Sequence, residues 1–313
     1  MALEYTKHDW VVEIQTPVQE ITEEEKSTVL DLILDNTFVR WKKQKLTPQE
    51  QLDFISGFGA VDRYWKNWEH VNNKHLFFEG YPGIIRVSGK LKDGKIGQFG
   101  HKEVLKWHCN RPQDPNRKPF VWLYAVGGSK GSVTHWTNNF LAYNDLTTEE
   151  KAFYETIKIQ YIGHRFEKEM KYTNNKLWYE WVDNQLAQMD LWHKMILTNP
   201  NGKKGIWISP LEVGSIEGMS QKEMLEFTQE MLEKLTQPKY VYSHKWEDGD
   251  LTISEQFFGL HQRDHFENMH LRELHRIGFN ANKLIPDMRY EGYNGYLEGH
   301  TGFLDYFPAE HKD

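Results

Sequence analysis

The stretch of this 313-residue chain with the clearest chemical potential is 246–276, WEDGDLTISEQFFGLHQRDHFENMHLRELHR. After an Asp-Gly turn signal, apolar and polar residues alternate at 251–254, which predicts a half-buried strand. His261 follows this strand, and Arg272 and Arg276 come 11 and 15 residues later. A neutral imidazole can hold a divalent metal, and a guanidinium can grip a carboxylate through two parallel hydrogen bonds. The segment therefore contains a candidate metal ligand and a candidate carboxylate anchor.

A second set of candidate ligands lies 153 residues upstream of His261, in the sequence LKWHCNRP. His108 and Asn110 flank Cys109, so in an extended strand both side chains would point to the same face. Two histidines and one further oxygen ligand on one face of a metal, with the other positions open, form the arrangement of non-haem Fe(II) oxygenases. The sequence therefore predicts a metal site made of His108, Asn110 and His261.

With these residues the chain resembles the taurine dioxygenase-like (TauD/TfdA) family of Fe(II)/2-oxoglutarate-dependent dioxygenases. The resemblance rests on WHCN at 107–110, GSVTHW at 131–136, WEDGDL at 246–251, and His261 with the RELHR arginines. Flanking similarity at 38–61 and 199–209 extends it over roughly residues 10–305. Each motif alone is weak, and the match depends on their order and spacing.

The resemblance implies an α+β fold whose core is a double-stranded β-helix of the jelly-roll or cupin kind, with flanking helices. One domain is expected to span residues 1–313. The resemblance also implies an enzyme with Fe(II), 2-oxoglutarate and O2 as cofactors. Such an enzyme would hydroxylate an unactivated C–H of a small, acidic or amino-acid-like metabolite while 2-oxoglutarate is decarboxylated to succinate.

The same resemblance implies roles for three further residues. Thr134 and Arg272 match the pair that binds the distal carboxylate of 2-oxoglutarate in the family. This pairing is physically reasonable, because a guanidinium and a hydroxyl together satisfy a carboxylate that is costly to bury alone. Arg276 matches the arginine that commonly meets the acidic group of the substrate.

Asn110 departs from the family pattern, which has aspartate or glutamate at this position. An amide keeps the oxygen but loses the charge, so iron should be held less strongly. Three interpretations stay open: a working hydroxylase with an amide ligand, a halogenase with water or halide at this position, and a catalytically impaired binding homologue or a deliberately replaced acidic ligand. Halogenation ranks below oxygenation, because asparagine is bulkier than the glycine or alanine that opens a halide position. Asp114, in the following loop, is a candidate replacement carboxylate.

A competing interpretation takes His261 and His265 as an i, i+4 zinc pair on a helix. The spacing lacks the glutamate that a zinc protease places after its first histidine, and the strand pattern upstream disfavours a helix. We therefore prefer the pairing of His261 with His108.

Local signals place the surrounding elements. Four helix starts have the S/T-x-x-E spacing of a capping box, at Thr22/Glu25, Thr47/Glu50, Thr147/Glu150 and Ser220/Glu223. Strands are predicted at 10–14 and 119–126, and another strand is predicted to begin near Thr134. Residues 75–100 are predicted to form short strands and turns, and residues 111–119 a polar loop over a pocket mouth. Residues 165–205 show no clean period.

Composition narrows the class of partner. A formal net charge of −7 argues against binding to a nucleic-acid backbone. The chain has no apolar run of 18 residues and no signal-like N-terminus, and its single cysteine fits a reducing compartment. We expect a cytoplasmic enzyme with a small-molecule substrate and no nucleic-acid or membrane partner; homo-oligomerisation stays open.

Overall fold

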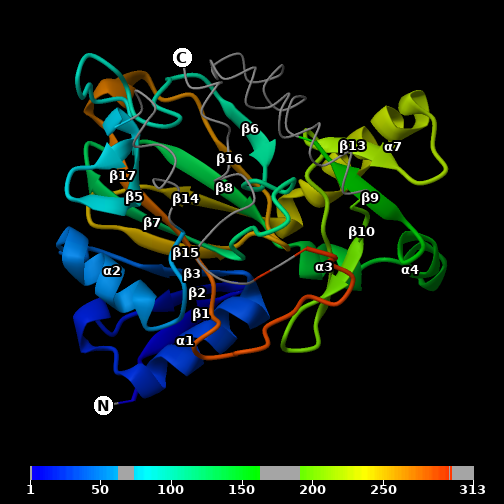
Figure 1. The fold of residues 1–313 in the computed structure, drawn as a ribbon, viewed down its shortest axis with the longest axis horizontal. Helices are drawn as coiled ribbons and strands as arrows, with labels where there is room; N and C mark the ends of the chain where they lie inside the picture. The colour runs from blue at the N-terminus through cyan, green and yellow to red at the C-terminus, as the bar shows by residue number, and fades with distance from the viewer. Residues whose placement is uncertain (1, 63–73, 163–190, 296, 298–313) are drawn as a thin grey trace, which may run out of the picture.

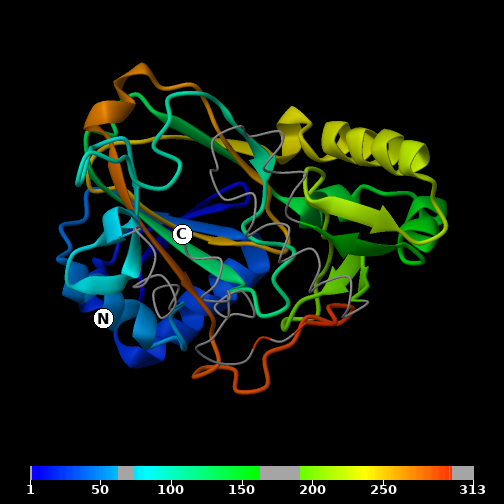
Figure 2. The same ribbon diagram turned by 45° about the horizontal axis from the view of Figure 1, so that its top comes forward.

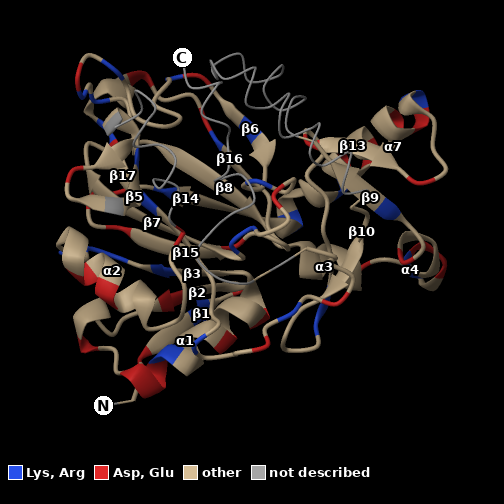
Figure 3. Cartoon of the chain, viewed as in Figure 1, with Lys and Arg blue, Asp and Glu red and all other residues tan. Residues whose placement is uncertain are grey.

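The computed structural model describes residues 2–62, 74–162, 191–295 and 297. Helices and strands are mixed, and most strands belong to two large sheets (Figure 1). The predicted α+β class is confirmed for these residues. Acidic and basic residues are interspersed along the drawn chain (Figure 3), and the formal net charge of the whole chain is −7.

The bounds of the elements are as follows. The helices are α1 (Glu23–Asn36), α2 (Pro48–Ser56), α3 (Asn139–Asn144), α4 (Thr148–Tyr154) and α7 (Gln221–Leu235). The strands of the two large sheets are β1 (Tyr5–His8), β2 (Val11–Ile14), β3 (Phe38–Trp41), β4 (Phe77–Phe78), β5 (Tyr81–Ser88), β6 (Leu105–His108), β7 (Phe120–Gly127), β8 (Val133–Thr137), β14 (Val241–Lys245), β15 (Leu251–Glu255), β16 (His261–Arg263) and β17 (Glu273–Phe279). The smaller sheets contain β9 (Lys158–Tyr161), β10 (His193–Lys194), β11 (Ile196–Thr198), β12 (Lys204–Ile206) and β13 (Val213–Ile216).

The larger sheet has eight strands in the order β1-β2-β3-β15-β7-β17-β5-β4, and every pairing is antiparallel except β2 with β3. Helices α1 and α2 lie along one face of this sheet (Figures 1 and 2). Phe54 of α2 packs on Trp41 of β3 and Trp122 of β7, with ring centroids 6.3 and 5.8 Å away. This face is therefore closed by a helix layer and is not available for ligands.

The other face of the eight-stranded sheet packs on the four-stranded sheet, whose order is β14-β8-β16-β6. Phe38 of β3 contacts Trp136 of β8 and Tyr242 of β14, with ring centroids 4.8 and 5.3 Å apart. Because successive strand residues alternate in direction, β3 buries Phe38 between the sheets and Trp41 under α2. The interior between the two sheets is the place where side chains from both can meet.

The capping-box predictions are confirmed at all four helices. In each, the Ser or Thr side chain accepts a hydrogen bond from the backbone N–H of the N3 residue, and the side chain of the N3 glutamate accepts one from the backbone N–H of the N-cap residue. The predicted strands at 10–14 and 119–126 appear as β2 and β7, and the strand near Thr134 as β8. Within the described residues, no helix is long and apolar enough to cross a bilayer. Most of the 165–205 stretch lies outside the described residues.

One local prediction was wrong, and a second one needs to be refined. The strand at 251–254 was expected to be half-buried, but all five residues of β15 are buried, since Leu251 and Ile253 join the helix-side core while Thr252 and Ser254 lie on the opposite face. Residues 111–119 were expected to cover a pocket mouth, and four of them line a pocket, namely Arg111, Asp114, Arg117 and Lys118, although most of the segment is buried. In both places polar residues line the interior, so their polarity did not indicate solvent.

Candidate active site

His108 and His261 lie side by side in the four-stranded sheet. They are register partners across β6 and β16, and their ring centroids are 4.1 Å apart. His261 is also the register partner of Trp136, whose side chain is in the core between the sheets. Directly opposed residues of an antiparallel pair share a face, so both imidazoles face this interior.

Both histidines are held in the neutral form. Nδ1 of His108 lies 2.7 Å from the carbonyl oxygen of Lys106, so it carries the ring proton and Nε2 has the lone pair. Burial lowers the pKa of His108 to about 4, and burial followed by the charge of neighbouring groups lowers the pKa of His261 well below its usual value. Nδ1 of His261 is buried without a hydrogen-bond partner. Two neutral, buried imidazoles side by side, one of them with an unpartnered Nδ1, have the chemistry of a divalent metal site, so these residues fit the iron that the sequence implies.

Asn110 follows this pair but is placed by a different contact from the one expected. Strand β6 ends at His108, and Arg111 has a left-handed φ of 51°, so Asn110 is not on a strand with His108. Its Nδ2 donates to Oε1 of Gln256, 2.7 Å away. The shared face predicted from extended geometry is therefore replaced by a hydrogen bond to a residue 146 positions away.

Neither alternative ligand joins the histidines. Asp114 is buried in an ion pair with Arg111, with 2.8 Å between the carboxylate and Nη2. His265 is half exposed and pairs with Glu267, and His261 is in a strand, so the helical zinc pair is wrong. Among the described residues no group of three His, Cys, Asp or Glu side chains could hold a metal. Asn110, the remaining candidate ligand, is a neutral side chain two residues after His108.

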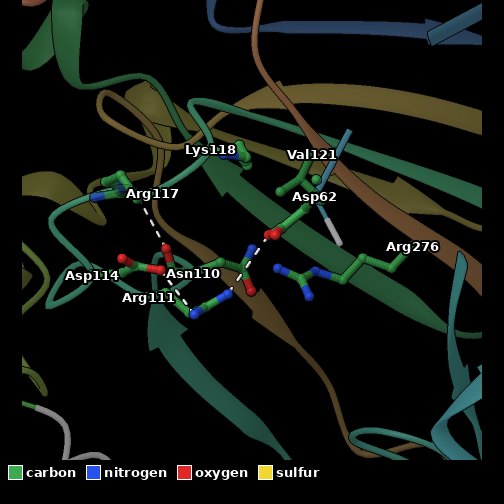
Figure 4. A pocket seen from close by; sticks show the side chains of 9 residues that line it. Asp62, Asn110, Arg111, Asp114, Arg117, Lys118, Val121 and Arg276 are labelled. Atoms are coloured by element: carbon green, nitrogen blue, oxygen red, sulfur yellow. Dashed lines mark hydrogen bonds and ion pairs between the residues drawn. The ribbon is translucent and has the colours of Figure 1, made fainter. Parts of the chain in front are cut away.

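Arg276 approaches the histidines from the opposite sheet. It is buried in β17, and its charge helps to lower the pKa of both His108 and His261. It also lines a small pocket together with Asn110, and Figure 4 shows its guanidinium pointing toward Asn110 and Asp62. The remaining lining residues include three cations and one more carboxylate: Arg111, Arg117, Lys118 and Asp114. Four cations against two carboxylates give this pocket a positive balance, which favours an anion.

A second cationic site surrounds Arg272, which follows a 3-10 turn and precedes β17. Its Nε donates to Oγ of Ser132 at 3.2 Å, while its buried Nη1 has no hydrogen-bond partner. Burial lowers the pKa of Arg272 to about 9, and the charge of Arg263 adds to the effect. The guanidinium is thus desolvated but still charged at neutral pH, a state that a buried carboxylate would satisfy.

Thr134 is connected to this arginine through two neighbours, Trp246 and Ser132. Oγ of Thr134 accepts from Nε1 of Trp246 at 2.9 Å, so its own proton is left to donate. The backbone N–H of Trp246 donates to the carbonyl of Ser132, the residue that holds Arg272. A hydroxyl donor and a buried guanidinium are therefore linked by Ser132 and Trp246.

The structure thus brings His108 and His261 together, sets Asn110 and Arg276 on one pocket, and connects Thr134 with Arg272. Their roles as ligands stay predictions. Sequence reasoning missed Gln256, Ser132 and Arg117, which orient the candidate residues. Ser132 lies inside the GSVTHW motif and could have been noticed, whereas nothing local distinguishes Gln256.

Comparison with known proteins adds a family. Residues 5–277 match the family described as taurine catabolism dioxygenase TauD, TfdA family. The chain is 24% identical to pentalenolactone F synthase of Streptomyces arenae over 68% of this chain and 75% of that protein. It is 24% identical to an alpha-ketoglutarate-dependent 2,4-dichlorophenoxyacetate dioxygenase of Burkholderia sp. (strain RASC) over 75% of this chain and 79% of that protein.

Solved structures share the fold. The crystal structure of AAD-2 in complex with Mn(II) and N-oxalylglycine superposes with a TM-score of 0.69 at 20% identity, covering 90% of this chain and 98% of that one. A taurine dioxygenase from Burkholderia xenovorans gives a TM-score of 0.66 at 17% identity, covering 89% of each chain. At these identities the likeness establishes a common architecture.

Proposed function

Since the chain belongs to the taurine catabolism dioxygenase TauD, TfdA family, we propose that it hydroxylates an unactivated C–H of a small acidic or amino-acid-like metabolite. Members of this family are 2-oxoglutarate-dependent dioxygenases, and this chain is an enzyme of that kind with Fe(II), 2-oxoglutarate and O2 as cofactors. The observation that carries the proposal is the register pairing of His108 with His261, with Arg276 facing them.

His108, His261 and Oδ1 of Asn110 are the proposed metal ligands. When bound, Fe(II) lets O2 oxidise 2-oxoglutarate to succinate and CO2, with one oxygen atom entering succinate and the other the substrate as hydroxyl. His108 keeps its lone pair on Nε2 because Lys106 holds the proton on Nδ1. The aromatic packing between the sheets keeps water away from these groups.

Arg272 and Thr134 are proposed to bind the distal carboxylate of 2-oxoglutarate. Thr134 is the register partner of Arg263, two residues after His261 on the same strand. Two strand residues span about 7 Å, and the residues two apart share a face. One five-carbon dicarboxylate can bridge that separation, with its keto acid end at the histidines and its far end at Arg272.

Arg276 is proposed to meet the acidic group of the substrate. The positive balance of the pocket that it shares with Asn110 supports an anion. Two relatives support the same class, since their names give 2,4-dichlorophenoxyacetate and (S)-phenoxypropionate, both carboxylic acids, as substrates. A carboxylate or sulfonate held by Arg276 would place the adjacent carbons near the metal position.

Halogenation is the weaker alternative. A halide needs an emptied ligand position, whereas Asn110 fills its position with an amide fixed by Gln256. A binding protein without turnover is the other alternative, and the experiment below distinguishes it from an enzyme. We also propose that the two packed sheets form the double-stranded β-helix of the family, within one domain.

The test is anaerobic loading with Fe(II) and 2-oxoglutarate, followed by addition of O2 and a panel of small carboxylates, sulfonates and amino acids. We expect succinate to form with one equivalent of hydroxylated product when the right acid is present. Arg276→Gln should raise the KM for that acid while the KM for 2-oxoglutarate stays similar. Binding of 2-oxoglutarate without succinate from any acid would favour the non-catalytic alternative, and a chlorinated product in chloride buffer would favour the halogenase.

A further inference from the structure

The Gln256 side chain has two partners, of which the backbone N–H of Asn110 fixes its orientation. The backbone N–H of Asn110, which can only donate, lies 3.1 Å from Oε1, and Oγ of Ser254 lies 3.0 Å from Nε2. If the amide were turned over, the N–H of Asn110 would face another donor. Gln256 is only 1% exposed, so turning its amide over would cost a hydrogen bond in a largely buried place. The oxygen of Gln256 therefore faces Asn110.

This orientation in turn fixes the side chain of Asn110. Its terminal atom 2.7 Å from Oε1 of Gln256 must be a donor, so it is Nδ2. Oδ1 is then the branch that points away from Gln256. One obligate backbone donor thus determines both amides, without reference to any metal.

The two backbones are also clamped together. Nη2 of the buried Arg117 donates to the carbonyl of Asn110 at 3.1 Å and to that of Gln256 at 2.9 Å. Figure 4 shows the first of these bonds. The guanidinium itself packs on the rings of Trp207 and Phe257, 5.2 and 4.6 Å from their centroids. The Asn110–Gln256 pair is therefore held through side chains and main chain alike.

We propose that Gln256 is a positioning residue that selects an amide over a carboxylate at position 110 and presents Oδ1 of Asn110 to the metal. This inference rests on the proposed function, because it takes His108 and His261 as the other ligands. An aspartate at position 110 would place an oxygen where Nδ2 now lies, 2.7 Å from an oxygen of Gln256. Two acceptors at that distance repel, and turning Gln256 over would leave the backbone N–H without an acceptor. The surroundings of position 110 therefore favour a neutral amide, and the aspartate or glutamate of the family does not fit beside Gln256.

The first test measures Mn(II) binding by the EPR signal of the free ion, in the presence of 2-oxoglutarate. Gln256→Met removes the acceptor and should weaken Mn(II) binding about tenfold or more. Gln256→Glu keeps an acceptor for both donors of Asn110, with the Ser254 hydroxyl donating instead of accepting, and should bind Mn(II) at least as tightly as the wild type. Rescue by glutamate distinguishes positioning from a general loss of packing.

The second test uses thermal unfolding of the metal-free protein. Asn110→Asp should lower Tm by about 4 °C when Gln256 is present, because a carboxylate oxygen would then face the oxygen of Gln256 in place of a donor. In the Gln256→Met background the same substitution should cost much less, since the opposing oxygen is gone. Equal losses of Tm in the two backgrounds would overturn the selection of an amide.

His108→Ala keeps the inference and the proposed function separable. If His108→Ala abolishes Mn(II) binding while Gln256→Met leaves it unchanged, the metal site stands and the role of Gln256 falls. If the wild-type protein shows no Mn(II) binding that depends on His108, the proposed function fails, and the inference falls with it. Weakening by both variants, with rescue by Gln256→Glu, supports both.

Discussion

The histidine end and the arginine end of the site lie on the same interior but have opposite electrostatic designs. At the histidine end, burial keeps His108 and His261 neutral, and the proposed third ligand, Asn110, is an uncharged amide. At the arginine end, Arg272 stays charged although it is buried, and no carboxylate of the described residues forms an ion pair with it. The first end suits a cation and the second suits an anion. This difference is what the proposed function requires, with a metal at the first end and a dicarboxylate reaching to the second.

The largest effect should come from breaking the histidine end. His108→Ala removes a proposed metal ligand, so turnover should fall to background and Mn(II) affinity should drop by more than the 10–100-fold typical of residues that only orient ligands. Succinate assays and Mn(II) titration would measure this. His265→Ala is the matched control, because that histidine is half exposed and pairs with Glu267, and it should behave as the wild type. Retained turnover in His108→Ala would remove the histidine end from the site.

The neutrality of the histidine end predicts a pH dependence of stability. The folded-state pKa of His108 is about 4 and its unfolded value about 6.5, so the unfolded state binds a proton first as the pH falls. The contribution of His108 is fully present above pH 6.5 and is lost as the pH falls toward 4, by about 3 kcal/mol in total. Urea unfolding of the metal-free wild type and of His108→Asn at pH 7 and pH 4.5 would measure it. Parallel losses in the two proteins would contradict the buried neutral state of His108.

A substitution at the arginine end should weaken the binding of 2-oxoglutarate without changing the binding of the metal. Arg272→Met removes the charge that would pair with the distal carboxylate, a contact worth about 2–5 kcal/mol when buried. The KM for 2-oxoglutarate should rise about 100-fold, while Mn(II) affinity without 2-oxoglutarate stays close to the wild type. Arg289→Met, at an exposed arginine, is the control and should change neither quantity. Equal losses in metal and 2-oxoglutarate binding would mean that the two ends are not separate.

The smallest effect should come from Thr134. Thr134→Val deletes the one hydroxyl proposed to donate to the carboxylate, which is worth about 1.4 kcal/mol, or about tenfold in the KM for 2-oxoglutarate. Thr134→Ser keeps the hydroxyl and the acceptor used by Trp246, and should stay within about threefold of the wild type. If serine and valine variants have the same KM, the hydroxyl does not contact the cosubstrate.

Several features could be predicted from local sequence because their causes are local. A capping box needs only a Ser or Thr and a glutamate three residues later, and all four predicted boxes form. The types of the candidate residues were equally readable, since imidazole, guanidinium and amide have fixed chemistry. The burial of strands could not be predicted in this way. Polar residues that face an interior alternate along a strand with the same period of two as polar residues that face water. Thr252 and Ser254 illustrate this limit.

By itself, the sequence determined which groups the protein can use: two histidines, an amide where relatives have an acid, and two arginines at fixed spacing. The sequence also predicted that His108 and His261 would meet across 153 residues, and the register of β6 with β16 brings them together. Tertiary structure alone decided that the side-chain nitrogen of Asn110 donates to Gln256. The reason is that sequence periodicity reports the direction of a side chain within its own element. Which groups then meet is set by hydrogen bonds between distant strands, and those depend on the whole chain closing around one interior.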